Sequence, residues 1–97
     1  MRLCAAKAGV LGLTRALARE LSPEGIRANA IAPGLILTDF SRSGTPDEAK
    51  HAVAKDWALR RAGDASEIAG ACLFLASDLS SYVTGTTLDV NGGAHMR

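Results

Sequence analysis

The chain has 97 residues, of which 47% are apolar and 22% are charged, with 10 glycines and 3 prolines. This composition excludes a disordered tail and a fibrous repeat, and the length suits one small domain. Eleven basic and ten acidic side chains leave a net charge of +1, with no block of like charge. Nucleic acid and anionic membrane surfaces, which select proteins by bulk charge, are therefore not expected partners.

The cysteines and the N-terminal stretch limit the cellular context. Cys4 and Cys72 lie far apart, without a CxxC motif or a histidine at metal-ligand spacing. The pattern favours two buried thiols in a reducing cytoplasm over a disulfide framework or a zinc site. Lys7, Arg15 and Arg19 interrupt the apolar stretch before it reaches the ~18 residues of a membrane span. We expect a cytoplasmic protein with no membrane association.

The N-terminal segment has the periodicity of a helix. Apolar residues recur there at spacings of three and four, the pattern of one helix face. They are Leu3, Ala6, Val10, Leu13, Leu17 and Leu21. Small residues occupy most other positions, so a helix over residues 3–21 is expected to pack on two sides. Ser22-Pro23-Glu24-Gly25 ends it, because proline cannot continue the hydrogen bonds and glycine accepts a positive φ.

A short strand is predicted over residues 26–32, ending at Pro33-Gly34. Its polar member, Asn29, is expected to bond to neighbouring backbone in preference to a ligand. A stretch of low periodicity follows. Thr45-Pro46-Asp47-Glu48 then has the pattern of a capped helix start, and this helix is expected to run to about Trp57.

The last third of the chain predicts a helix and a strand. Asp64-Ala65-Ser66-Glu67 repeats the pattern of a helix start, and the apolar residues behind it predict a buried helix that ends near Ser77-Asp78. Residues 86–90 form a β-prone run between Gly85 and Gly92-Gly93. The predicted order is therefore helix, strand, helix, helix, strand.

This order indicates an α/β fold. Strands separated by helices pair in parallel through crossover connections, not as a hairpin. Two strands do not make a stable parallel sheet, because such strands need neighbours and cover on both faces. Residues 1–97 are therefore expected to form the latter part of one larger α/β domain, with the N-terminal half of that domain absent.

Collinear motifs along nearly the whole chain resemble the short-chain dehydrogenase/reductase family. Residues 5–10 (AAKAGV) with 14–18 (TRALA) are similar to its active-site helix, and residues 25–34 (GIRANAIAPG) to its sixth strand and Pro-Gly turn. Residues 59–69, 74–78, 81–85 and 89–93 are similar to its C-terminal helix and last strand. The resemblance implies the C-terminal portion of a Rossmann-like, doubly wound parallel sheet.

The resemblance also implies an activity and its residues. The family interconverts alcohols and carbonyls of small molecules by hydride transfer with NAD or NADP. Lys7 corresponds to the catalytic lysine that holds the cofactor ribose, although a charge lying along an apolar helix is the alternative. Pro33, Gly34, Ile36 and Thr38 correspond to the loop that binds the nicotinamide; otherwise Pro-Gly would only end a strand.

Two parts of the family's machinery are missing from these residues. Leu3 stands four residues before Lys7, where the family has its acid/base tyrosine, and leucine has no proton to give. No G-x-G-x-x-G run is present to seat the cofactor pyrophosphate. The resemblance therefore implies a chain that is inactive alone: a gene remnant, a split protein, or a sequence with its start placed too far downstream.

An alternative function is a non-catalytic interaction module. The family commonly uses the helix that corresponds to residues 3–21 at a dimer interface, which implies a homo-oligomer or pairing with a full-length relative. The lone tyrosine, Tyr82, is not expected to replace the missing acid, since it lies far from Lys7 in the sequence. For Trp57 and Phe40 the sequence leaves two roles open: contact with a substrate, or packing.

Overall fold

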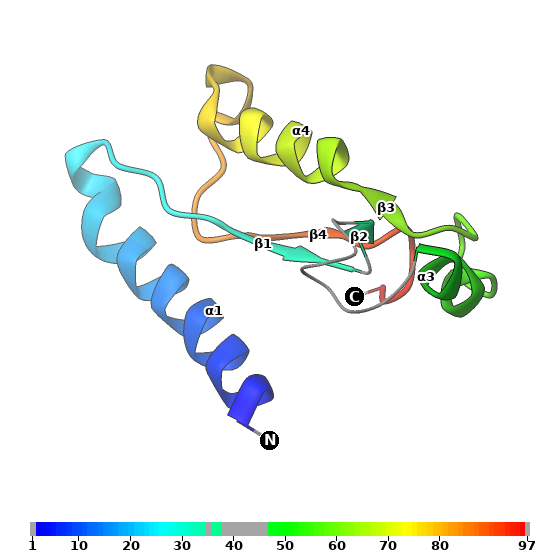
Figure 1. The fold of residues 1–97 in the computed structure, drawn as a ribbon. Helices are drawn as coiled ribbons and strands as arrows, with labels where there is room; N and C mark the ends of the chain where they lie inside the picture. Colours follow the sequence, from blue (N-terminus) through cyan, green and yellow to red (C-terminus); the bar gives the residue numbers. More distant parts are fainter. Residues whose placement is uncertain (1, 35, 38–46, 97) are drawn as a thin grey trace. The chain divides into compact units, whose positions relative to one another are not determined.

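The computed structural model describes residues 2–34, 36–37 and 47–96, and their helices and strands are shown in Figure 1. The chain divides into two compact units. Unit 1 comprises residues 1–31 and 74–88, and unit 2 comprises residues 32–73 and 89–97. Three elements pass from one unit into the other, namely β1 (Ala30–Pro33), α4 (Ala65–Ala76) and β4 (Thr87–Val90).

Unit 1 begins with α1 (Arg2–Leu21), which confirms the helix predicted over residues 3–21. A single 3-10 turn, η1 (Ser22–Glu24), follows, and Gly25 then takes φ +82°. The proline and the left-handed glycine end the helix as expected. A second 3-10 turn, η2 (Asp78–Ser80), follows α4, and the side chain of Ser77 caps it by accepting from the backbone N–H of Leu79 at 3.3 Å.

The apolar face of α1 is largely uncovered. Thr14 and Ala18 are buried, whereas Val10, Leu13 and Leu17 on the predicted stripe are 56%, 58% and 36% exposed. The described part of the chain therefore does not supply the packing on two sides that the sequence predicts for this helix.

Strands β1 and β4 form a two-stranded parallel sheet, which confirms the parallel arrangement and the strand predicted at residues 86–90. The backbone N–H of Ala30 donates to the carbonyl of Thr86, and that of Gly34 donates to the carbonyl of Val90, both at 2.9 Å. From the first of these bonds to the second, the donor and the acceptor each move four residues towards the C-terminus, so the two strands run parallel.

The prediction of a strand from residue 26 is wrong at its start, since β1 begins at Ala30 and includes Pro33. The residues just before β1 form hydrogen bonds to a loop instead of pairing with a neighbouring strand. The N–H of Ala28 donates to the Thr84 hydroxyl at 3.2 Å, and the carbonyl of Ala28 accepts from the N–H of Gly85 at 2.7 Å. These long-range bonds replace strand pairing at this end.

Unit 2 contains two very short strands that the sequence does not predict. β2 (Ile36–Leu37) pairs in parallel with β3 (Gly63–Asp64), with Ile36 opposite Gly63. Between them lies α3 (Asp47–Ala54), which ends three residues before the predicted limit at Trp57. The N–H of Trp57 bonds to the carbonyl of Ala54 in a turn. The predicted cap at Thr45 and Pro46 lies outside the described residues.

Helix α4 has the predicted bounds and an unexpected exposure. It ends at Ala76, next to the expected Ser77, but it has no buried residue, and Leu73 is 73% exposed. The prediction of a buried helix is therefore wrong, because in the described residues no second layer covers this apolar helix. The prediction of buried thiols is likewise wrong for Cys72, which is exposed, while the Cys4 side chain lies outside the described part.

Among the helices described, none combines the length and the apolar character that crossing a bilayer requires.

Candidate functional site

The predicted nicotinamide loop begins where β1 ends. Pro33, the last residue of β1, is exposed, and Gly34 is half-buried. A Cβ built on Gly34 would lie 2.7 Å from the Cβ and 2.8 Å from the Cα of Asn91, so only glycine fits at this position. Ligands of open α/β sheets bind beyond the carboxyl ends of strands. Pro33 and Gly34 therefore stand where such a ligand would be met.

Asn91 closes the neighbouring strand end with a compact turn. Its side-chain oxygen accepts from the N–H of Gly93 at 3.0 Å, and its side-chain nitrogen donates to the carbonyl of His95 at 3.0 Å. Gly92 and Gly93 take φ +60° and +86°, a conformation that other residues rarely adopt. The turn after β4 thus presents a fixed surface against which Gly34 packs.

Ile36 lies in β2 and lines a small cavity of unit 2. The volume of this cavity is about 130 Å³, below the ~300–1,000 Å³ of typical small-molecule sites. This cavity is therefore too small to enclose a dinucleotide. The lining residues are Ile36, Leu59, Arg61, Gly63, Glu67, Val90, Asn91 and Gly92.

Lys50 reaches this segment from α3. Its side chain is 3% exposed, and its Nζ donates a hydrogen bond to the carbonyl oxygen of Ile36 at 2.9 Å. Lys50 is not among the residues predicted for the site. A signal is present, because Lys50 lies one helical turn before the fully buried Ala54 and so on the buried face of α3.

Arg61 and Glu67 form a two-bond ion pair beside the cavity. The guanidinium donates to the two carboxylate oxygens at 2.6 and 3.0 Å. Glu67 also accepts from the backbone N–H of Asp64 at 2.8 Å, which is the reciprocal bond of a capping box at the start of α4. The hydrogen bonds from Arg61 and from the Asp64 backbone lower the pKa of Glu67 from an ordinary 4.5 to about 2.

This depressed pKa predicts an acid-sensitive contribution to stability. Because the folded chain holds Glu67 ionised, the contribution should be complete above pH 4.5 and decline as the pH falls towards 2. The difference in urea midpoint between wild type and Glu67→Gln should shrink over that interval. Glu24→Gln, which changes an exposed carboxylate on η1, is the control. A difference in urea midpoint between wild type and Glu67→Gln that stays constant down to pH 2 would contradict this prediction.

Known proteins match this chain over nearly its whole length. A family model described as enoyl-(acyl carrier protein) reductase matches residues 2–95. The chain belongs to the short-chain dehydrogenase/reductase family. A 3-oxoacyl-[acyl-carrier-protein] reductase of Haemophilus influenzae is 48% identical over 93 residues, which are 96% of this chain and 38% of that protein. An uncharacterized short-chain type dehydrogenase/reductase of Sinorhizobium fredii is 54% identical over 89 residues, 92% of this chain and 35% of that protein.

A solved structure agrees in fold with this dehydrogenase/reductase chain. It is an NADPH-bound short-chain oxidoreductase of Pseudomonas aeruginosa, described as containing an atypical catalytic center. The TM-score is 0.83 at 40% identity, over 96% of this chain and 38% of that one. The fold is thus the C-terminal portion of a Rossmann-like sheet. The chain spans about a third of the length of the relatives it matches.

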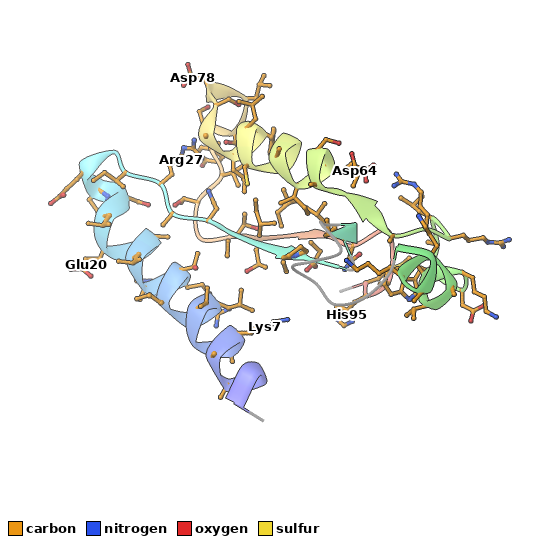
Figure 2. The ribbon with its side chains drawn as sticks, viewed as in Figure 1. Lys7, Glu20, Arg27, Asp64, Asp78 and His95 are labelled. Carbon is orange, nitrogen blue, oxygen red and sulfur yellow. The ribbon has the colours of Figure 1, made fainter. Side chains whose placement is uncertain are left out.

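The family residues predicted on α1 belong to unit 1. Lys7 is exposed, and Figure 2 shows its side chain extending away from the helix. The backbone of Leu3 is helical, so residues 3 and 7 lie one turn apart on one face, as the family pattern requires. Pro33, Gly34 and Ile36 lie together in unit 2. Thr38 and Phe40 lie outside the described residues, so their predicted roles remain predictions.

Asn29, Tyr82 and Trp57 are the other residues weighed for a role in the site. The side-chain nitrogen of Asn29 donates to the carbonyl of Val83 at 3.0 Å, and its oxygen accepts from the N–H of Thr86 at 3.1 Å. Both ends of this amide bind backbone, as expected. Tyr82 is fully exposed, and Trp57 is half-buried.

Proposed function

We propose that this chain forms the nicotinamide side of the cofactor site in an NAD(P)-dependent oxidoreductase that interconverts alcohols and carbonyls of small molecules. The observation that carries the proposal is the segment at residues 33, 34 and 36, called here the nicotinamide segment. It leaves the end of a parallel strand and packs against the turn at Asn91, in a chain of the short-chain dehydrogenase/reductase family.

The residues present fit the nicotinamide end of such a cofactor. Exposed Pro33 offers an apolar ring face, and the missing side chain of Gly34 lets the end of β1 pack closely against Asn91. The exposed ammonium of Lys7 is available to bind ribose hydroxyls. When bound, the cofactor supplies or accepts the hydride. The NADPH in the Pseudomonas aeruginosa relative supports this choice of cofactor.

Proton transfer needs a group that this chain does not hold on α1. A phenol has a pKa near ~10, and a neighbouring ammonium favours its ionised form. Leucine at position 3 cannot exchange a proton with a substrate oxygen. In this proposal the chain therefore binds and orients the cofactor, while the acid/base group comes from elsewhere or is lacking.

A titration with reduced nicotinamide mononucleotide tests the proposal, because this probe carries only the half of the cofactor that these residues would meet. We expect the amide signals of Gly34 and Ile36 to shift with one dissociation constant in the isotope-labelled chain. Lys7→Ala tests separately whether this lysine binds the ribose. No saturable shift at Gly34 and Ile36 would refute the proposal.

We also propose a cytoplasmic location and self-association through α1. The exposed apolar residues Val10, Leu13 and Leu17 recur along one face, and exposed apolar patches of this kind usually mark protein contacts. A second copy of the chain presents the same face. This observation also favours the alternative function of an interaction module.

Self-association gives a direct prediction. Sedimentation of the purified chain should show a dimer or larger species, and Leu13→Asp should shift it to monomer, because a carboxylate cannot be buried unpaired at an apolar contact. Leu79→Asp alters an exposed leucine outside α1 (83% exposed, against 58% for Leu13) and is the control, expected to leave the assembly intact. A compact wild-type monomer with a sharp thermal transition would contradict the prediction.

A further inference from the structure

Lys50 is a cation in an unusual setting for a residue outside the predicted site. At 3% exposure its ammonium is withdrawn from water, which is costly unless oxygen acceptors replace the water. The carbonyl of Ile36, 14 residues away, is one such acceptor at 2.9 Å. Lys50 is therefore held on the buried side of α3 with polar partners in place of water.

The hydrogen bond fixes one peptide group of the nicotinamide segment. Because a peptide is planar, a carbonyl of Ile36 held towards Lys50 also sets the direction of the N–H of Leu37. A cation at the carbonyl polarises the peptide and makes that N–H a stronger donor. Parallel pairing with Gly63 and Asp64 holds the same two residues from the side of β3.

Lys50 is not the sole anchor of α3. Ala54, one turn further on, is fully buried, and Nδ1 of His51 accepts from the N–H of Ala62 at 3.3 Å. The helix is thus attached to the start of β3 by apolar and polar contacts that do not involve the ammonium. Loss of the charge should therefore leave α3 in place.

We propose that Lys50 is a positioning residue for the nicotinamide segment: through the Ile36 carbonyl it sets the backbone that would face the nicotinamide, without touching the cofactor itself. This inference rests on the proposed function. It assigns to α3 a role in nicotinamide affinity, separate from the ribose contact of Lys7 on α1.

The test compares Lys50→Met, Lys50→Arg and the matched control Lys55→Met, which changes an exposed lysine just after α3. Two probes are titrated into the labelled chain: reduced nicotinamide mononucleotide, and ribose 5-phosphate, which lacks the ring. Lys50→Met should move the Ile36 carbonyl signal and raise the dissociation constant for the mononucleotide about tenfold. Its affinity for ribose 5-phosphate should not change. Lys50→Arg should restore most of the loss, and Lys55→Met should match wild type.

Several outcomes would overturn the inference. An unchanged dissociation constant in Lys50→Met, with the Ile36 carbonyl signal displaced, would show that the hydrogen bond has no bearing on the ring. An equal rise in the dissociation constants of both probes would show that Lys50 acts on folding and not on the position of the nicotinamide segment. If Lys50→Met does not fold, Lys50→Gln is judged by the same two probes. Wild-type chain that binds no mononucleotide would refute the proposed function, and this inference with it.

Discussion

The purified 97-residue chain is expected to show no steady oxidation of NADH or NADPH with any carbonyl substrate. The resemblance implies that Leu3 stands where the family has its proton-donating tyrosine, and general acid–base catalysis alone supplies typically ~10²–10⁴-fold in rate. These residues also lack a glycine-rich run to seat the pyrophosphate on a helix N-terminus. Both losses act on the same reaction, so the expected effect is complete loss of measurable turnover.

An absorbance assay at the nicotinamide band measures this directly. Leu3→Tyr returns the phenol but not the pyrophosphate site, so it too is expected to remain inactive. Lys7→Ala is the control for contaminating reductases, because it cannot affect an activity that belongs to another protein. Steady turnover that Lys7→Ala abolishes would contradict the prediction and show that the chain carries out catalysis unaided.

Arg27→Met is expected to lower the free energy of unfolding by about 3 kcal/mol. The guanidinium donates to three backbone carbonyls, those of Val83, Leu75 and Ser77, at 3.0, 2.9 and 3.3 Å. Figure 2 shows Arg27 reaching towards the end of α4, where helical carbonyls lack partners of their own. Methionine fills the space of the stem and leaves these carbonyls without their charged donor.

Urea denaturation of Arg27→Met against wild type measures the loss. Arg19→Met removes an exposed cation of α1 and is the control, expected to change stability by less than about 0.5 kcal/mol. Hydrogen exchange locates the effect, since the N–H groups of Gly85 and Thr86 lie in the loop that Arg27 and Asn29 hold. Protection of these amides at the wild-type level in Arg27→Met would contradict the role of Arg27 in holding this loop.

A local motif can single out candidate site residues. Pro33, Gly34 and Ile36 lie close together in the sequence, with Pro33 ending β1 and Ile36 beginning β2, and their role at a cofactor stays a prediction. Lys50 was not predictable in the same way, because nothing beside it in the sequence indicates a carbonyl partner 14 residues earlier. The close approach of Gly34 to Asn91, 57 residues apart by numbering, is equally invisible to a local pattern.

By itself the sequence determined the limits of α1 and α4 and the turn that ends α1. The bounds of α1 and α4, the stop at Pro23 and Gly25, and the cap at Glu67 all depend on partners within a few residues, so neighbouring side chains encode them. Tertiary structure alone decided where β1 begins. Arg27 and Asn29 bond to carbonyls and amides 48–57 residues away, which removes their segment from the sheet. It also decided the exposure of α1 and α4, because burial depends on which surfaces fold against a helix and not on the helix's own residues.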